Sequence, residues 1–396
     1  MVTTKNKKHD AFEDDSISNV DITSGVTDLG TESGTSRLPQ DEPADTKDTE
    51  QSIVWIGMDL GTSRTAIACS NGVRESFPSL IGYPKDVVAR KLLGRDVLYG
   101  KDVIKHRLSL KVYRPLEVGV IKGSNGTDGV EGEEADLNMT AAKELVKHAI
   151  RMARAPADAL VYCTIGAPAE ASINNRSAIL ESAKEVIDSV MICSEPFSVA
   201  YGMNVLSDAL VIDIGAGTTD LCRMHGTLPE AEDQITLDHG GDVIDDKLME
   251  LMKKNHPEVA FSRQMIVEAK EKYSTVRSTT EPIVVNWPVN GKPTDIDITN
   301  EMREACFSII PPIVDALGKL VASFDPEFQE VLRNNVLLGG GGSQIRGLAD
   351  AITQYMNEHL GGGNVRQVEE PIFGGANGAL SISKDMPPEF WEKLSS

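Results

Sequence analysis

The sequence contains few of the residues from which disulfides and zinc sites are built. Only five of its 396 residues are cysteines, and aromatic residues make up 5% of the chain. The cysteines are odd in number, scattered and never spaced as CxxC, at Cys69, Cys163, Cys193, Cys222 and Cys306. This pattern argues against a disulfide framework or a zinc site. It predicts reduced cysteines that are buried as small apolar residues.

Basic residues and long apolar runs are also scarce. The chain has 39 Lys and Arg against 60 Asp and Glu, for a formal net charge of −21. Binding to nucleic acid or anionic lipid requires a basic surface, so we expect neither as a main partner. No run approaches the roughly 20 apolar residues that span a bilayer, and the start of the chain, MVTTKNKKHD, is polar. We therefore expect no secretory signal, no direct membrane insertion and a cytoplasmic protein.

What the sequence does contain is an α/β pattern behind a polar beginning. Residues 1–50 are rich in Ser, Thr, Asp and Glu without apolar periodicity, which predicts a disordered acidic tail. A second polar segment, 123–136 (GSNGTDGVEGEEAD), predicts a mobile acidic insertion. From Ile53 onward, apolar runs predict strands at 53–60, 65–70, 160–166, 209–217 and 219–224, and within 335–343 a strand that runs into a glycine turn. Amphipathic spacing predicts helices at 140–154, 172–188, 243–254, 264–277, 301–322 with a break at Pro311-Pro312, and 345–360.

One device occurs twice. MDLGTSRTA (58–66) and IDIGAGTTD (212–220) each place an Asp at the end of an apolar strand, then a glycine turn, then a return strand. Glycines let successive backbone N–H groups point at a phosphate. The carboxylates of Asp59 and Asp213 can hold Mg²⁺ through its waters. Two copies predict two related domains that face one ligand.

A third glycine segment, GGGGS (339–343), follows an apolar strand and precedes a predicted helix. Four glycines allow the backbone to pass close to a flat ligand. The N-terminus of the following helix would supply further donors. A flexible linker is the alternative, but a linker does not usually stand between a buried strand and a regular helix.

These motifs resemble those of a known family. Asp-Leu-Gly-Thr (59–62), Asp-Ile-Gly-Ala-Gly-Thr-Thr-Asp (213–220) and the tetraglycine (339–342) are similar to the two phosphate motifs and the adenosine motif of the actin superfamily. SEPFSVAYG (194–202) and EPIFGGA (370–376) resemble its two connecting segments. The resemblance covers residues 53–396. It implies an α/β, actin-like (ribonuclease H-like) two-domain ATPase fold with four subdomains around a nucleotide cleft.

The resemblance also implies domain boundaries. Subdomain IA would comprise 51–82, 139–205 and 371–396, and subdomain IB would comprise 83–138. Subdomain IIA would comprise 206–241 and 300–370, with 242–299 as subdomain IIB.

Within the superfamily, three segments are most similar to the magnetosome-associated bacterial actins: 78–97 (PSLIGYPKDVVARKLLGRDV), 226–237 (GTLPEAEDQITL) and 386–394 (MPPEFWEKL). This closer resemblance implies an ATPase of the bacterial cytoskeleton that polymerises into cytoplasmic filaments alongside a magnetosome chain. Its partners would be further copies of itself and an adaptor protein on the magnetosome. A cell-shape actin, a plasmid-segregating actin and a non-hydrolysing nucleotide-binding scaffold stay open as alternatives.

The resemblance assigns roles to individual residues. Glu195 would position the attacking water, with Thr218 and Asp213 beside it, although a Glu before Pro is also a common helix N-terminal acid. Asp59 and Asp213 would orient the waters of Mg²⁺. The residues that would hold the phosphates of ATP or ADP are Gly61, Thr62, Ser63, Gly215, Gly217, Thr218 and Thr219, while Asp59 and Asp213 would contact the nucleotide through its Mg²⁺. Gly241 and Asp242 would form a nucleotide contact of the second domain, Lys270 and Glu271 would contact the ribose and base, and Gly339, Gly340, Gly341 and Gly342 would pack against adenosine. For Lys270 and Glu271, a solvated helix face is the alternative.

Overall fold

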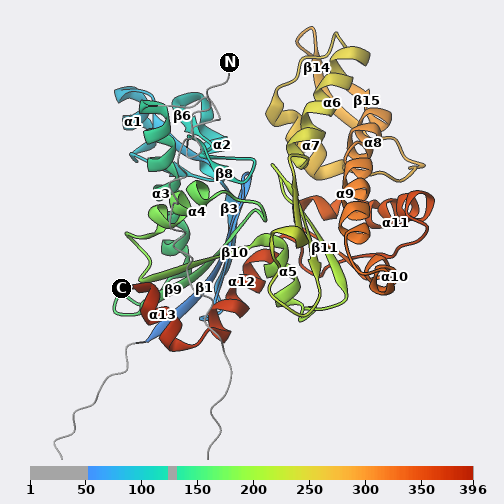
Figure 1. Cartoon of the computed structure of the whole chain (residues 1–396). Coiled ribbons are helices and arrows are strands. Elements are labelled where there is room, and N and C mark those ends of the chain that lie inside the picture. The colour runs from blue at the N-terminus through green and yellow to red at the C-terminus, as the bar shows by residue number, and fades with distance from the viewer. Residues whose placement is uncertain (1–51, 124–131, 396) are drawn as a thin grey trace, which may run out of the picture. The chain divides into compact units, whose positions relative to one another are not determined.

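Two five-stranded sheets of identical topology organise the chain in a computed structural model that describes residues 52–123 and 132–395. In each sheet a three-stranded antiparallel meander is followed by two parallel strands. The first sheet has the order β3-β2-β1-β9-β10 and the second the order β13-β12-β11-β16-β17. We refer to each sheet with its covering elements as lobe I and lobe II (Figure 1). The duplication that the two glycine motifs predict is therefore present in the strand order.

The sequence predicts six of the ten strands in these two sheets, but not β3, β10, β13 and β17. Lobe I contains β1 (Ile53–Leu60), β2 (Arg64–Cys69), β3 (Arg74–Pro78), β9 (Leu160–Ala167) and β10 (Ser189–Ser194). Lobe II contains β11 (Ala209–Ile214), β12 (Thr219–Met224), β13 (Gln234–Leu237), β16 (Val336–Gly339) and β17 (Val365–Gln367). The predicted strand at 209–217 is too long, because its glycines form the turn that follows β11. The strand predicted within 335–343 ends at Gly339 and runs into a glycine turn, as expected.

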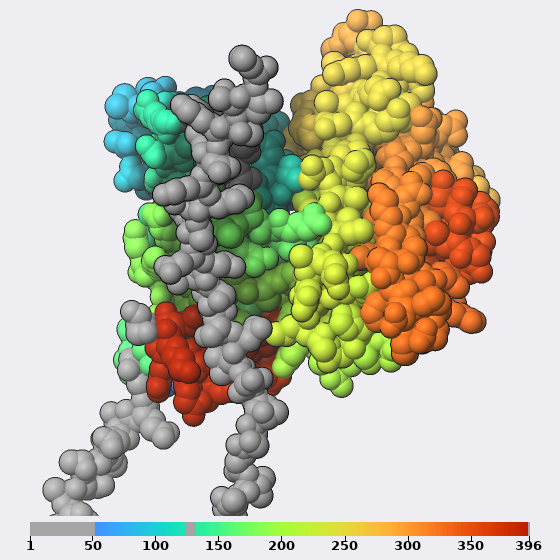
Figure 2. All heavy atoms as spheres, viewed as in Figure 1, coloured from blue at the N-terminus to red at the C-terminus, as the bar shows by residue number. Residues whose placement is uncertain are grey.

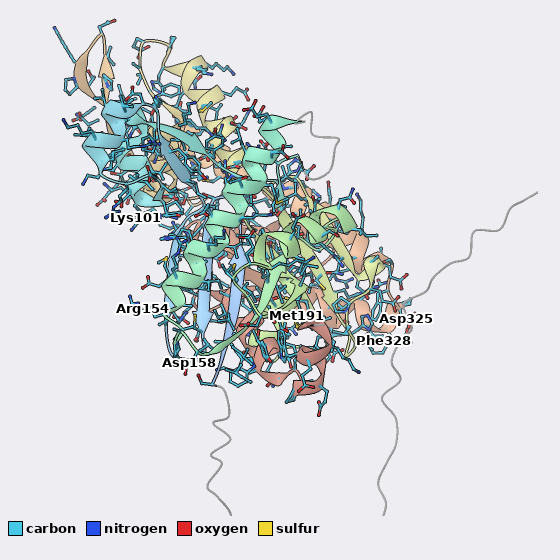
Figure 3. All side chains as sticks on the ribbon, turned by 90° about the vertical axis from the view of Figure 1, so that its left-hand side faces the viewer. Lys101, Arg154, Asp158, Met191, Asp325 and Phe328 are labelled. Atoms are coloured by element: carbon cyan, nitrogen blue, oxygen red, sulfur yellow. The ribbon has the colours of Figure 1, made fainter. Side chains whose placement is uncertain are left out.

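Helix α3 (Glu133–Ala153) corrects the predicted boundary of the acidic insertion. The spacing predicts a helix from 140, but Glu133, Glu134 and Asp136 form its first turn, where acidic side chains offset the positive end of the helix dipole. Residues 124–131 of the insertion and the tail 1–50 lie outside the described residues. Arg154 ends α3 in the left-handed conformation (φ 53°), and Asp158 lies in the loop that leads to β9 (Figure 3).

The remaining elements of lobe I cover its sheet and extend it. Helix α4 (Ile173–Ala183) begins at the predicted cap, where the Ser172 side chain accepts a hydrogen bond from the Asn175 amide. It ends five residues before the predicted end. A small three-stranded sheet consists of β4 (Ile81–Pro84), β5 (Leu98–Tyr99) and β6 (Leu110–Tyr113), and a hairpin follows it with β7 (Leu116–Glu117) and β8 (Val120–Ile121). The helices between these strands are α1 (Val87–Leu93), α2 (Lys101–His106) and η1 (Arg107–Ser109).

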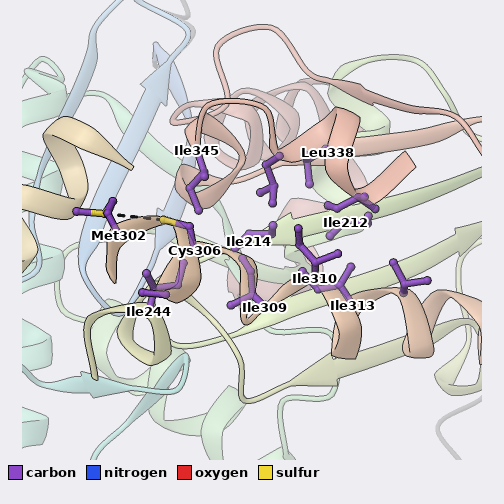
Figure 4. Packing of buried hydrophobic residues seen from close by; sticks show 14 of the residues in the cluster. Ile212, Ile214, Ile244, Met302, Cys306, Ile309, Ile310, Ile313, Leu338 and Ile345 are labelled. Carbon is purple, nitrogen blue, oxygen red and sulfur yellow. Dashed lines mark hydrogen bonds between the residues drawn. The ribbon is translucent and has the colours of Figure 1, made fainter. Parts of the chain in front are cut away.

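Lobe II has its own apolar core, in which side chains of the sheet meet the helices that cover it (Figure 4). Ile212 and Leu338 from the sheet pack with Ile310 and Ile313 from one long helical segment. That segment is broken, as predicted, into α8 (Thr299–Phe307) and α9 (Ile310–Ala322). The other elements are η2 (Ala231–Asp233), α6 (Gly241–Asn255), α7 (Arg263–Tyr273), β14 (Val284–Val289), β15 (Lys292–Asp297), η3 (Pro326–Phe328), α10 (Gln329–Asn334), η4 (Gly341–Gln344) and α11 (Leu348–His359).

By length and composition, the segment Thr299–Ala322 is long and apolar enough to cross a bilayer. This differs from the expectation that was drawn from the lack of a long uninterrupted apolar run. Within the structure, 56% of its most apolar window is buried. Met302, Ile309 and Leu317 are fully buried in the core of lobe II. Packing inside the lobe therefore accounts for its composition.

Two helices carry the chain between the lobes. Helix α5 (Glu195–Gly202) leads from β10 to β11, and α12 (Gly374–Asp385) follows β17 and returns to lobe I, where it packs against β1 and β9. The two helices pack closely against each other (Figure 1). They correspond to the two predicted connecting segments.

The C-terminal helices complete lobe I. In α12, the Ser383 hydroxyl donates a hydrogen bond to the Ile56 carbonyl and accepts one from the Thr164 amide. Trp391, in α13 (Pro388–Ser395), is 1% exposed and stacks on Tyr162 of β9. Helices α12 and α13 therefore contribute buried side chains to the core of the first lobe.

Candidate functional site

The first glycine turn, between β1 and β2, is held by side-chain hydroxyls. The Ser79 hydroxyl donates to the Gly61 carbonyl (2.7 Å) and lies 2.9 Å from the Thr65 hydroxyl. The Thr62 hydroxyl accepts a hydrogen bond from the Gly119 amide (2.7 Å), which ties the turn to the segment after β7. Thr62 is only 4% exposed. The conformation of this turn thus depends on three buried hydroxyls.

The second glycine turn, between β11 and β12, is held by the main chain. The Gly215 amide closes the turn by donating to the Thr218 carbonyl (2.9 Å). The amides of Gly241 and Asp242, at the start of α6, donate to the carbonyls of Gly215 (3.0 Å) and Ala216 (2.8 Å). The start of α6 therefore carries this turn.

The tetraglycine bend lies beside the second turn. Gly340 has φ 74°, and a Cβ there would lie 2.2 Å from Asp213 Oδ1, so this position requires glycine. A Cβ on Gly341 would meet no protein atom within 4 Å. One prediction here is wrong: a single turn of 3₁₀ helix, η4, includes the last two glycines, and α11 begins only at Leu348. The N-terminus of α11 therefore does not directly follow the tetraglycine bend.

These three turns line one cavity of about 390 Å³. Its predicted wall residues come from both lobes: Asp59, Gly61, Thr62, Ser63, Glu195, Asp213, Gly215, Gly217, Thr218, Gly241, Lys270, Glu271, Gly340, Gly341 and Gly342. Three other predicted residues do not line the cavity. The Thr219 hydroxyl donates to the His239 carbonyl, Asp242 pairs with Arg114 (2.7 Å), and Gly339 ends β16 against Val199.

The wall also contains residues that were not among the predicted site residues: Arg64, Ala66, Gly119, Ala216, Ile244, Ser274, Gln344, Ile345, Pro371, Ile372 and Gly375. Pro371, Ile372 and Gly375 belong to the second connecting segment, so the resemblance contained a signal for them. Gly119 and Ile244 carry no local signal, because only the tertiary fold brings them to the cavity.

Four buried carboxylates lie at or beside the wall near the two glycine turns, and three of them line the cavity itself. Burial raises the pKa of Asp59 to about 6. Burial, then the charges of Asp59 and Asp220, raise the pKa of Asp213 well above its usual value. Burial also raises the pKa of Glu195, with further contributions from the charges of Asp59, Asp220 and Asp213. Burial raises the pKa of Asp220 although that carboxylate accepts hydrogen bonds from Ala169 and Thr236.

No lysine or arginine among residues 52–123 and 132–395 forms an ion pair with these four carboxylates. Within the same residues, no cluster of three or more His, Cys, Asp or Glu forms a complete metal site. A cation here would therefore take most of its ligands from water and from a bound anion. That is the preference of Mg²⁺, so the donor set fits this ion. A bound cation would also lower the pKa of each carboxyl.

Glu195 is the first residue of α5, and Pro196 follows it. It is therefore a helix N-terminal acid and a wall residue of the cavity at once, so the two alternatives from the sequence are both present. Cys193 lies two residues earlier, where burial raises the pKa of its thiol to about 12. The thiol is therefore protonated at neutral pH and does not act as a nucleophile.

Lys270 and Glu271 reach the cavity from α7. The Lys270 ammonium donates to the Gly241 carbonyl (2.7 Å) and pairs with Asp245 (2.9 Å). Its side chain is 16% exposed, so the alternative of a solvated helix face does not describe it. Glu271 is exposed but lies on the wall.

The fold and the site together define an actin-like protein. Residues 54–387 match the model of the MreB/Mbl protein family, and the chain belongs to that family. The structure of MreB 5 of Spiroplasma citri bound to AMPPNP shares the fold, with a TM-score of 0.68 at 20% identity, over 87% of this chain and all of that one.

The more similar relatives are MamK proteins. The chain is 36% identical to the actin-like protein MamK of Paramagnetospirillum magneticum over 86% of its length and 95% of the relative's length. It is also 36% identical to MamK of Magnetospirillum gryphiswaldense, over 86% of this chain and 92% of that one. A MamK double helical filament superposes with a TM-score of 0.80 at 35% identity, over 85% of this chain and all of that one.

Proposed function

We propose that this protein is an ATPase that binds Mg-ATP in the cavity between the two glycine turns and polymerises into filaments. The observation that carries the proposal is the cavity wall, to which both turns and the tetraglycine bend contribute. Among the solved relatives, a non-polymerising MamK mutant is bound to AMPPNP, with a TM-score of 0.63 at 36% identity.

The phosphates would lie between the two turns, where the backbone amides of Gly61 and Gly217 would serve as donors. Adenosine would pass over Gly341, where the structure leaves open space beside the bend. Lys270 and Glu271 would border the ribose and base. Magnesium, when bound, would supply the positive charge that the acidic end of the cavity lacks. Asp59 and Asp213 would orient its waters.

For hydrolysis, Glu195 would orient a water toward the terminal phosphate and accept its proton. The phosphate end of the cavity favours this assignment because Glu195 lies on the wall together with Thr218 and Asp213. Thr218 would help to place the water. In phosphoryl transfer the protein contributes mainly positioning and charge neutralisation, so this small set is sufficient.

Polymerisation would couple the ATP state to a closed arrangement of the lobes, and hydrolysis would shift the population back. The MamK filament structures support self-association as the biological assembly. The similarity to MamK proteins over most of the chain supports a place in the bacterial cytoskeleton of the cytoplasm, alongside a magnetosome chain, with an adaptor protein as the link.

The direct test combines phosphate release with sedimentation. The full chain is incubated with Mg-ATP, with ATP in EDTA, and with Mg-AMPPNP, and pellets are imaged by electron microscopy. We expect filaments with both nucleotides in magnesium and phosphate release with Mg-ATP alone. A wild-type chain that pellets but releases no phosphate would be a scaffold, and one that binds no nucleotide would refute the proposal.

A further inference from the structure

Arg114, between β6 and β7, joins two segments that belong to different lobes. Its Nε donates to the Thr62 carbonyl (3.0 Å) in the first glycine turn of lobe I. Its Nη2 donates to Asp242 Oδ2 (2.7 Å) at the start of α6 in lobe II. Nothing in the sequence marks this arginine, and it does not line the cavity.

Both acceptors are themselves tied to the phosphate end of the cavity. Thr62 is a wall residue whose hydroxyl holds the Gly119 amide. Asp242 follows the wall residue Gly241, and its amide donates to the Ala216 carbonyl in the second turn. One guanidinium therefore connects the two turns across the gap between the lobes.

The turns approach each other closely at this point. A Cβ on Gly217 would lie 2.7 Å from Val118 Cα and 3.0 Å from the Thr62 hydroxyl oxygen. Any separation of the lobes here must break one of the two Arg114 hydrogen bonds. The side chains of Arg114 and Asp242 are 30% and 28% exposed, so solvent screens their ion pair only in part.

We propose that Arg114 is a positioning residue that latches the two lobes around bound nucleotide. This inference rests on the proposed function, because it requires a nucleotide that prefers the closed arrangement. If nucleotide prefers the closed arrangement, the latch raises nucleotide affinity by the same factor by which bound nucleotide favours the latch, since coupling between two events is reciprocal. The latch controls retention of the nucleotide and leaves the hydrolytic step to Glu195.

The geometry explains why arginine stands here. The planar guanidinium of Arg114 presents N–H donors in two directions at once. Its two acceptors, the Thr62 carbonyl and the Asp242 carboxylate, lie on different elements. A lysine ammonium is a single point charge and would keep one of the two contacts. Arg114→Lys should therefore fall between the wild type and a variant without donors.

The test measures how fast a fluorescent ATP analogue leaves the full chain in magnesium. Arg114→Met keeps the length of the side chain and removes both donors, so we expect release to be roughly 10-fold faster, within the usual range of coupling between sites. The KM for ATP should rise by a similar factor, while kcat at saturating ATP stays within about 2-fold. Asp242→Ala should also speed release, and the double variant should release no faster than Arg114→Met alone.

Arg95→Gln is the matched control, because it breaks an Arg–Asp pair (3.4 Å, to Asp102) that lies within lobe I. It should release nucleotide at the wild-type rate. Wild-type release from Arg114→Met, equal effects of Arg95→Gln, or additive effects in the double variant would each overturn the latch. Should Arg114→Met fail to fold, as melting without nucleotide would reveal, Arg114→Lys and Asp242→Ala decide the matter. A wild-type chain without nucleotide affinity would instead remove the proposed function itself.

Discussion

The two glycine hairpins have the same shape but are stabilised in different ways. The first depends on the hydroxyls of Thr62 and Ser79, and the second on main-chain hydrogen bonds to the start of α6. They differ in charge as well, because Asp59 pairs in register with Ala66, whereas Asp213 pairs with Asp220. The duplicated topology therefore fixes where the turns lie, while the support and the acidity of each copy are set by separate residues.

The largest effect should come from a residue that belongs to neither hairpin. Glu195→Gln removes the proposed general base and keeps the size of the side chain, so we expect hydrolysis to slow by about 10²–10³-fold. Nucleotide affinity should stay within a few-fold, because the variant leaves both glycine turns, the proposed phosphate sites, unchanged. Single-turnover phosphate release and analogue binding, measured on the same preparation, separate the two quantities. Equal phosphate release from variant and wild type would assign catalysis to one of the hairpins instead.

The next effect should distinguish the two hairpin carboxylates. Asp59→Asn and Asp213→Asn should each weaken Mg-dependent nucleotide binding by roughly 10–100-fold, as loss of a carboxylate that orients a metal's environment commonly does. Without ligand, Asp213→Asn should raise the melting temperature more, because the charges of Asp59 and Asp220 add to the burial of Asp213. For Asp59, by contrast, burial accounts for the raised pKa. Calorimetry with and without magnesium checks both expectations. Identical melting temperatures for the two variants would contradict the asymmetry.

The pH dependence should follow Asp59. Its pKa in the folded protein, about 6, lies above the ordinary value of 3.8, so folding favours the protonated carboxyl. The ligand-free protein should therefore lose stability as pH rises through about 6, and magnesium affinity should fall as pH drops below it. Melting curves and analogue binding between about pH 5 and 7.5 test both directions. Asp59→Asn should flatten both profiles, and an unchanged slope would assign the titration to another group.

The smallest effects should come from two buried hydroxyls, that of Ser79 beside the first turn and that of Thr219 at the start of β12. Ser79→Ala leaves the Gly61 carbonyl and the buried Thr65 hydroxyl without this partner, which should cost about 1–3 kcal/mol of unfolding free energy. Thr219→Val removes the hydrogen bond that the buried Thr219 hydroxyl donates to the carbonyl of His239, an exposed residue, and should cost about 0.5–1.5 kcal/mol. Urea unfolding of both variants gives the comparison. A larger loss of unfolding free energy in Thr219→Val than in Ser79→Ala would contradict this order.

Much of the fold is predictable from short patterns. Apolar runs that end in Asp and glycine locate β1 and β11 within a few residues, because a strand and its turn are encoded locally. The break between α8 and α9 follows from Pro311-Pro312. The start of α3 is missed because Glu133, Glu134 and Asp136 are polar enough to suggest a loop, although the same acids stabilise the beginning of a helix.

The site is predictable only where a motif carries it. Fifteen predicted residues lie on the wall of one cavity, and each belongs to one of the quoted segments or to α6 and α7. Thr219 and Asp242 lie beside wall residues, but their side chains bond to His239 and Arg114 instead. Such partners come from distant segments. Single-sequence patterns therefore indicate which residues reach the cavity more reliably than what each side chain does there.

The return of the chain into lobe I through α12 has a consequence for synthesis on the ribosome. Lobe II is made from one continuous stretch, so it can fold as soon as that stretch has emerged. The sheet of lobe I must wait for Ser383 and Trp391, which are translated more than 300 residues after β1 begins. At about 5–20 residues per second, the first lobe spends many seconds incomplete. During synthesis, lobe II should therefore complete its fold before lobe I does.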